Sequence, residues 1–77
     1  MDNKTQKQWV LNYLKKNKNG ITSMKAFVWA RITRLSARIY DLRKDGYCIH
    51  TFKEPNTFVR GTHARYVLIK DEPELFI

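Results

Sequence analysis

The sequence has little cysteine, little acidic charge and no long apolar run, and each shortage narrows what the protein can be. Cys48 is the single cysteine, which excludes a disulfide framework and a cysteine-based zinc site within one chain. A lone thiol is typical of a reducing compartment such as the cytosol. No apolar run approaches the roughly 20 residues that cross a bilayer, and residues 1–20 lack the apolar core of a signal peptide. We therefore expect a soluble, cytoplasmic protein with no membrane partner.

The inventory of reactive side chains is equally short. The only histidines, His50 and His63, have no acidic cluster near them, and a metal site needs three or four ligands. No glycine-rich phosphate loop and no Ser-His-Asp triad can be assembled from the chain. We expect a protein that is not an enzyme and that carries neither a metal nor another cofactor.

The shortage of acids leaves the chain strongly basic, with 15 Lys and Arg against 7 Asp and Glu and a formal charge of +8. Three of the acids lie in the last seven residues, DEPELFI, so residues 1–70 carry 15 basic and 4 acidic side chains. We predict one domain over residues 1–70, followed by an acidic, apolar tail over residues 71–77. So basic a body favours a polyanionic partner, nucleic acid before anionic membrane. The alternative is a surface whose charge only keeps the protein soluble.

Apolar residues at helical spacing predict a first helix that starts at Thr5 and ends at Gly20. Thr5, with Gln8 three residues later, matches a capping box. Glycine is the residue that most often follows the end of a helix. We expect the buried stripe of this helix to consist of Trp9, Val10, Tyr13 and Leu14.

A second, short helix is predicted to follow, capped by the hydroxyl of Thr22 or Ser23. Its buried stripe is expected at Met24, Phe27, Val28 and Ile32, with Trp29 off the stripe. The tight turn that ends it resembles the turn of a helix-turn-helix unit. Arg31 occupies the turn position where glycine is commoner, which costs free energy if its φ is positive.

The third predicted helix is capped by Thr33 and ends at Gly46. Its buried face is expected at Leu35, Ile39 and Leu42, which recur at i, i+4 and i+7. The period then changes to two, which predicts strands in YCIHTFK, residues 47–53, and ARYVLIK, residues 64–70. Pro55-Asn56 and Gly61 mark a turn between the strands. We expect a β-hairpin with a long, basic tip.

Ile21 stands alone before the second helix and predicts a short edge strand, the third strand of the sheet. The element order is then three helices followed by two strands. This order predicts an α+β fold, a winged helix-turn-helix in which three helices are followed by a β-hairpin wing.

Residues 21–47, ITSMKAFVWARITRLSARIYDLRKDGY, resemble a family of small helix-turn-helix domains that recur in phage and prophage genomes. The pattern of that family reads ITS…A…ITRLSARI.DLRK.GY, and the resemblance covers residues 5–69. It implies a winged-helix fold, DNA binding and, for a phage-encoded protein, the cytoplasm of the host cell. Arg31 stands where the family's turn has glycine.

The third helix is the predicted reading element. Leu35, Ile39 and Leu42 point inward, so we expect the opposite face to carry Arg34, Ala37, Arg38 and Asp41. Arginine is the side chain best matched to guanine O6 and N7 in the major groove. Hydroxyls of this helix could meet phosphates or base edges, and the basic hairpin could reach backbone phosphates. The predicted DNA-binding residues are Arg31, Thr33, Arg34, Ser36, Ala37, Arg38, Tyr40, Lys53, Arg60, His63 and Arg65.

These features lead to one hypothesis and two rivals. The leading hypothesis is a phage-type protein that binds double-stranded DNA, as a transcriptional regulator or as an excisionase-like architectural factor. The first rival is a phage inhibitor that binds a host protein such as a CRISPR effector, an anti-CRISPR protein. The second rival is binding of double-stranded RNA. A homodimer that spans two half-sites is a further expectation, for which the apolar end of the tail is the only hint.

Overall fold

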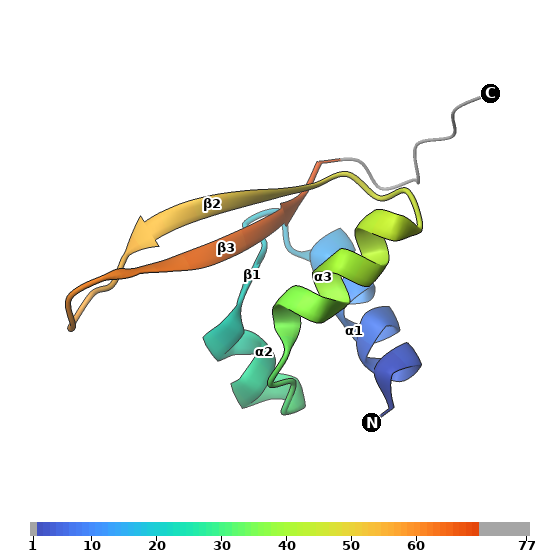
Figure 1. Ribbon diagram of the computed structural model, residues 1–77, viewed down its shortest axis with the longest axis horizontal. Coiled ribbons are helices and arrows are strands. Elements are labelled where there is room, and N and C mark those ends of the chain that lie inside the picture. The colour runs from blue at the N-terminus through green and yellow to red at the C-terminus, as the bar shows by residue number, and fades with distance from the viewer. Residues whose placement is uncertain (1, 70–77) are drawn as a thin grey trace.

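The computed structural model describes residues 2–69, so the predicted tail lies outside the described residues. Within these described residues the chain forms three helices and a three-stranded antiparallel sheet (Figure 1), which confirms the predicted α+β class. The elements in chain order are α1 (Asn3–Lys16), β1 (Ile21–Thr22), α2 (Ser23–Ala30), α3 (Leu35–Lys44), β2 (Ile49–Pro55) and β3 (Thr62–Leu68).

The core forms where the helices meet the base of the sheet. Leu35, Ile39 and Leu42 of α3 are each 1% exposed, so the predicted inward face of α3 is confirmed. Each such side chain contributes about 1.5–3 kcal/mol when it leaves water. In α1 the buried residues are Val10, Leu11 and Leu14, whereas Trp9 and Tyr13 are half-buried and stack on each other. The other buried apolar residues are Ile21, Ala26, Ile32, Ile49 and Leu68.

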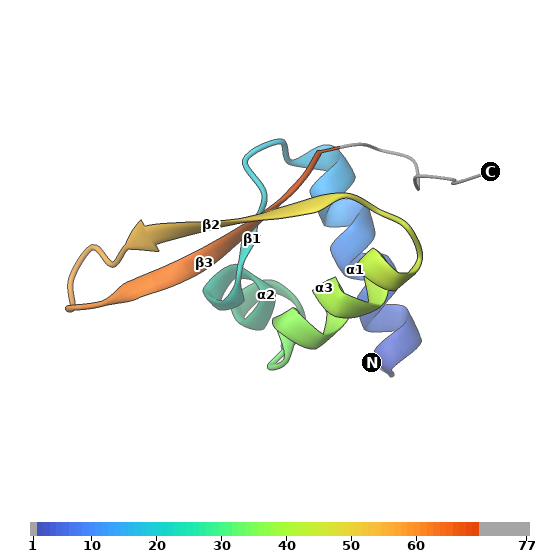
Figure 2. The same cartoon turned by 45° about the horizontal axis from the view of Figure 1, so that its top comes forward.

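The sheet has the strand order β1-β3-β2, and β2 and β3 form a hairpin. The pairing runs from Ile49 opposite Leu68 to Pro55 opposite Thr62, so only residues 56–61 remain in the loop. The strands therefore pair further toward the tip than the expected loop of residues 54–63. β1 pairs with Tyr66 and Arg65, which confirms the short edge strand. The hairpin extends well beyond the helices (Figures 1 and 2), along a molecule that measures 45 × 25 × 20 Å.

Two of the expected helix caps are wrong. The N-cap of α1 is Asp2, whose Oδ1 accepts a 2.7 Å hydrogen bond from the Thr5 N–H, so Thr5 lies inside the helix. A carboxylate is a stronger acceptor than a hydroxyl and is favoured by the helix dipole. The same hydrogen bond lowers the pKa of Asp2. In α3 the N-cap is Arg34 instead of Thr33, and no side chain caps the helix.

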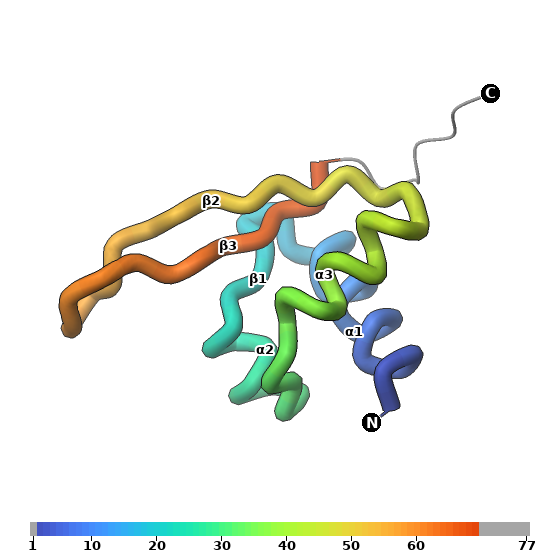
Figure 3. The backbone as a smooth tube through the Cα atoms, viewed as in Figure 1, coloured from blue at the N-terminus to red at the C-terminus, as the bar shows by residue number. Residues whose placement is uncertain are grey.

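The expected burial of α2 is also wrong. Thr22 caps the helix as predicted, and Ile32 is buried as predicted. However, Met24, Phe27 and Val28 are 76%, 46% and 60% exposed, and the inward residues are Ala26 and Ala30. The reason is space: α2 starts directly after β1 and is joined to α3 by residues 31–34, which holds its backbone close to both (Figure 3). Only small side chains fit on that side.

Gly20 has a different role from the expected helix stop. α1 ends at Lys16, and Gly20 lies at the entry to β1 with a φ of +83°. A Cβ built on Gly20 would lie 2.1 Å from the backbone oxygen of Tyr66 and 2.8 Å from Cγ2 of Val67. The close approach of this turn to β3 therefore requires glycine.

Gly20→Ala should lower the free energy of unfolding by about 2–5 kcal/mol, since left-handed strain costs about 1–2 kcal/mol and overpacking about 1–3 kcal/mol. Gly61→Ala is the matched control, because Gly61 has a φ of +107° but its nearest contact to a new Cβ is 3.4 Å away. In that variant we expect the free energy of unfolding to fall only by the cost of the left-handed strain, about 1–2 kcal/mol. Chemical denaturation measures both values, and equal losses would contradict the steric role of Gly20.

Candidate nucleic-acid interface

The outer face of α3 differs from the expected one at Arg38. This residue is 8% exposed, and its Nε lies 3.2 Å from Oδ2 of Asp41. The prediction that the guanidinium groups of Arg34 and Arg38 project together is therefore wrong. Arg38 follows Leu35 by three residues and precedes Leu42 by four, and residues at those spacings share one side of a helix.

Burial makes Arg38 a structural residue of α3. Nε is buried and has no hydrogen-bond partner, although the carboxylate of Asp41 lies 3.2 Å away. The attraction between Arg38 and Asp41 is therefore electrostatic and does not include a hydrogen bond from Nε. The aliphatic part of an arginine covers apolar surface while its charged end stays near water. Arg38 consequently seals the edge of the core instead of reaching outward.

The exposed residues of α3 are Ser36, Tyr40, Arg43 and Lys44, and Ala37 is half-buried. The guanidinium of Arg43 donates to the Ile49 carbonyl oxygen, so Ser36, Tyr40 and Lys44 remain for the outer face. Lys44 was not among the predicted contacts. Its Nζ lies 5.6 Å from the centre of the Tyr40 ring, so the two side chains share one patch. The spacing of four residues between them was the signal that could have found it.

The turn between α2 and α3 holds an arginine in a strained conformation. Arg31 has φ 57° and ψ 29°, which is the left-handed region. The positive φ explains why glycine is the commoner residue at this turn position. The Arg31 N–H donates to the Phe27 carbonyl oxygen at 2.8 Å and closes α2. Its guanidinium carbon lies 5.5 Å from the centre of the Phe27 ring, a cation–π contact. The exposed side chain therefore sits at the corner that leads into α3.

The N-terminal end of α3 is electropositive. Its first turn contains no acidic residue and no side chain caps it. The first N–H groups of a helix have no partner within the helix, and the helix dipole adds partial positive charge there. Thr33, Arg34 and Ser36 are exposed around this end. This combination favours an anionic group such as a phosphate.

The four predicted hairpin contacts divide into two pairs. Lys53 and Arg60 are exposed. His63 and Arg65 instead hold Glu54, which accepts from Arg65 Nε at 2.9 Å and lies 3.0 Å from His63 Nε2. His63 Nδ1 lies 2.8 Å from Asn56 Oδ1, across the base of the tip. His63 and Arg65 therefore stiffen the hairpin.

Arg65 links the hairpin to the body of the domain. Its Nη1 donates to the backbone oxygen of Asn19 at 3.2 Å, just before β1. Its hydrogen bond to Glu54 is the main reason that the pKa of Glu54 is lowered, with a smaller contribution from His63. The contact fixes where the hairpin leaves the helices.

All four carboxylates within residues 2–69 are engaged. Asp2 caps α1, Asp41 lies beside Arg38, Asp45 pairs with Lys7 at 2.7 Å, and Glu54 holds Arg65. None of these acids therefore forms an ion pair with a cation of the turn, of the outer face of α3 or of the hairpin tip. The cations of those regions that form neither an ion pair nor a side-chain hydrogen bond within the described residues are Arg31, Arg34, Lys44, Lys53 and Arg60. Arg43 of α3 also forms no ion pair within the described residues, but its guanidinium donates to the backbone oxygen of Ile49 and to Thr51 Oγ1.

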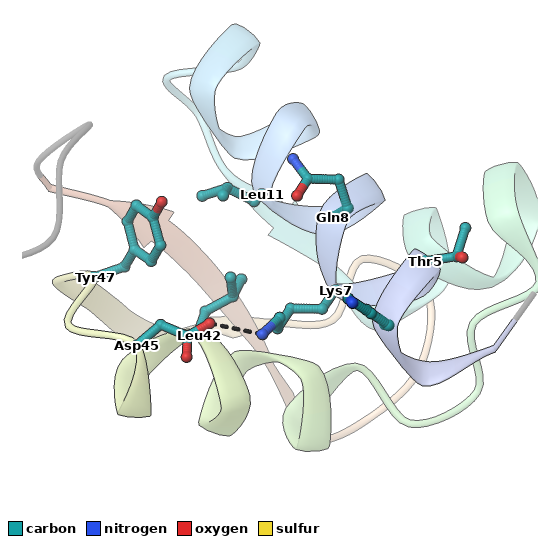
Figure 4. A pocket seen from close by; sticks show the side chains of 8 residues that line it. Thr5, Lys7, Gln8, Leu11, Leu42, Asp45 and Tyr47 are labelled. Carbon is teal, nitrogen blue, oxygen red and sulfur yellow. Dashed lines mark hydrogen bonds and ion pairs between the residues drawn. The ribbon is translucent and has the colours of Figure 1, made fainter.

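A groove of about 490 Å³ lies between α1 and the C-terminal end of α3 (Figure 4). Its apolar part includes Leu11 and Leu42, and the ion pair of Lys7 with Asp45 crosses it. None of the cations without an ion pair named above lines the groove. Over residues 2–69 no three His, Cys, Asp or Glu side chains are grouped to hold a metal, and no helix is long and apolar enough to span a membrane.

A comparison with known proteins identifies the arrangement. A family model described as a winged helix-turn-helix domain matches residues 5–71, which include most of α1 and every later element. Neither a curated protein nor a solved structure matches the chain.

The Glu54 network predicts a pH dependence. Arg65→Gln should raise the pKa of Glu54 toward its ordinary value of 4.5, because the main cause of the lowering is removed. Since the folded-state pKa is depressed, Glu54 stabilises the native protein above its unfolded pKa, and this contribution is lost as the pH falls through the folded pKa. Carboxyl-carbon NMR titration measures the shift. Arg60→Gln is the control and should leave the titration unchanged; an equal change in both variants would contradict the contact.

Proposed function

Because the chain belongs to the winged helix-turn-helix domain family, we propose that it binds double-stranded DNA with the turn at residues 31–34 and the outer face of α3. The observation that carries the proposal is the distribution of charge. The carboxylates of the described residues are engaged elsewhere, and Arg31 and Arg34 stand without an acidic partner at the electropositive end of α3. Such a face matches a duplex that presents phosphates on both sides of its major groove.

In this proposal Arg34 is the base-reading side chain. A bidentate pair with guanine O6 and N7 contributes about 1–3 kcal/mol of discrimination. Ala37 is small enough for the helix to approach the base edges closely, and the hydroxyls of Thr33 and Ser36 lie where phosphates would approach the helix end. Tyr40 and Lys44 extend the contact along α3. Arg38 is no longer proposed as a reader, since it is buried beside Asp41.

The hairpin acts as the wing. Lys53 and Arg60 would contact backbone phosphates, which position a protein on DNA without reading the sequence. His63 and Arg65 act indirectly, because their contacts with Glu54 keep the hairpin rigid. The resemblance to phage domains favours a role as a transcriptional regulator or as an excisionase-like architectural factor, in the cytoplasm of a host cell and without catalysis.

Selection from a random pool of DNA duplexes at stated salt concentrations tests the proposal most directly. We expect an enriched motif and a log K that falls linearly with log salt, at about −0.9 per phosphate contact. Competition with double-stranded RNA separates duplex DNA from RNA. No enrichment, together with a host protein retained from a nuclease-treated lysate, would favour the inhibitor of a host protein such as a CRISPR effector.

Arg34→Gln should weaken binding to the selected site by about 1–3 kcal/mol and relax its sequence preference. Lys16→Gln is the control, since Lys16 is exposed at the C-terminal end of α1 and carries the same charge. We expect the control to change the affinity by less than about threefold, as for a distant surface charge. Fluorescence anisotropy with a labelled duplex measures both. A sequence preference that survives in Arg34→Gln would remove Arg34 from the reading role.

Arg31→Gly should weaken DNA binding without lowering the stability of the fold. Glycine adopts the left-handed conformation freely, so the free energy of unfolding should stay constant or rise by up to about 1 kcal/mol. Loss of the cation should weaken DNA binding and make the salt slope shallower by about one contact. Thermal unfolding and anisotropy are the two measurements. Unchanged binding would show that Arg31 is only a strained turn residue.

A further inference from the structure

The helix α2 turns its large apolar side chains toward solvent. Met24, Phe27 and Val28 lie at i, i+3 and i+4 and form one stripe along its outer side. Trp29, on the flank, is 72% exposed. We call these four residues the α2 face. α2 lies at the edge of the molecule, away from α1 (Figures 1 and 2).

The size of the α2 face makes it a candidate interaction surface. Single exposed apolar residues are normal, whereas the largest apolar patch of a typical monomer, about 300–600 Å², is often a functional surface. An aromatic side chain offers roughly 150–250 Å², so the exposures of the α2 face correspond to on the order of 400–500 Å². Elsewhere on the described helices, Tyr40 is the one large apolar side chain that stands out, and Lys44 covers its ring.

We propose that the α2 face is the contact between two copies of this chain. In a twofold dimer the same patch lies on both sides of the interface, so the two faces together would bury roughly 800–1,000 Å². This total is at or just below the lower limit of about 1,000 Å² for a specific protein pair, which is the range of weak, transient contacts. We therefore expect a weak, reversible dimer, with a Kd on the order of 10–100 µM.

The charged residues around the face set the salt dependence of the dimer. Lys25 and Arg31 border it, and neither has an acidic partner within the described residues. Across a twofold axis these like charges repel each other, and salt screens the repulsion. The dimer therefore strengthens as salt is added. An acidic partner protein on the same face would bind more weakly under the same conditions.

The dimer would form in the free protein, without DNA. It would also affect how the protein binds DNA. α2 is joined to α3 by residues 31–34, so a pair held through α2 carries two copies of the turn and of α3 on one particle. Two half-sites on one duplex are then within the reach of a single dimer.

Sedimentation velocity on the nuclease-treated, full-length protein tests the dimer, from about 5 to about 500 µM so that the expected Kd is spanned. We expect the weight-average mass to rise from monomer to dimer and the Kd to fall when NaCl is raised. Val28→Lys places a charge in the centre of the α2 face and should weaken the dimer at least tenfold, because a buried, unpaired ammonium is costly. Val28 is 60% exposed, so the substitution leaves the core intact, which circular dichroism checks.

Val59→Lys is the matched control. Val59 is 68% exposed in the loop of the hairpin, so the same substitution adds the same charge at a similarly exposed valine. We expect this variant to dimerise like the parent protein. A parent that stays monomeric at 500 µM, a dimer that dissociates as salt is added, or an equal loss in both variants would overturn the proposal. None of these outcomes depends on whether the protein binds DNA.

Discussion

The burial of Leu35, Ile39 and Leu42 is the constraint on which the rest of the structure depends. These side chains fix the rotation of α3 about its own axis, and each is 1% exposed. Once that rotation is set, every other residue of the helix has its place: Arg38 is drawn to the edge of the core, while Ser36, Tyr40 and Lys44 face water. The free energy of burying three large apolar side chains, about 1.5–3 kcal/mol each, far exceeds what an exposed arginine gains or loses by a change of direction. The candidate interface is therefore a consequence of the core.

Structural features that are set by a single physical effect, such as apolar burial or the left-handed preference of glycine, could be predicted from the sequence. The stripe of α3, the stop at Gly46 and the pairing of Ile21 with the sheet each follow from a single dominant effect. The burial of Arg38 could also have been predicted, since its spacing from Leu35 and Leu42 places it beside them on the helix. The caps were harder, because several polar residues compete at the start of a helix and the carboxylate of Asp2 is the better acceptor. At the site, the exposed Arg34 was predictable, whereas the contacts that draw His63 and Arg65 to Glu54 depend on cross-strand register.

The helix α2 shows why an apolar stripe does not by itself say which side is buried. Two apolar sets are present at helical spacing, the large Met24, Phe27 and Val28 and the small Ala26 and Ala30. Transfer free energies alone favour burying the large set. Tertiary geometry decides otherwise, because the short connections to β1 and α3 hold the backbone too close to both for a large side chain. A sequence contains the two stripes but not the distance between backbones.

Three departures from local preference meet at one corner of the molecule. Arg31 is left-handed although it is not glycine, α3 begins without a side-chain cap, and α2 exposes its larger stripe. Each of these costs free energy in an isolated domain, and a glycine at position 31 or a capping residue at position 34 would remove part of the cost. Elsewhere the chain follows the rules: α1 is capped by Asp2, the glycines have positive φ, and the acids are engaged. Residues in locally unfavourable conformations typically cluster at functional sites, where a protein binds a ligand or a partner. The concentration of such departures in residues 24–36 is thus a physical argument for placing the working surface of this protein there, and it does not depend on the charge of the chain.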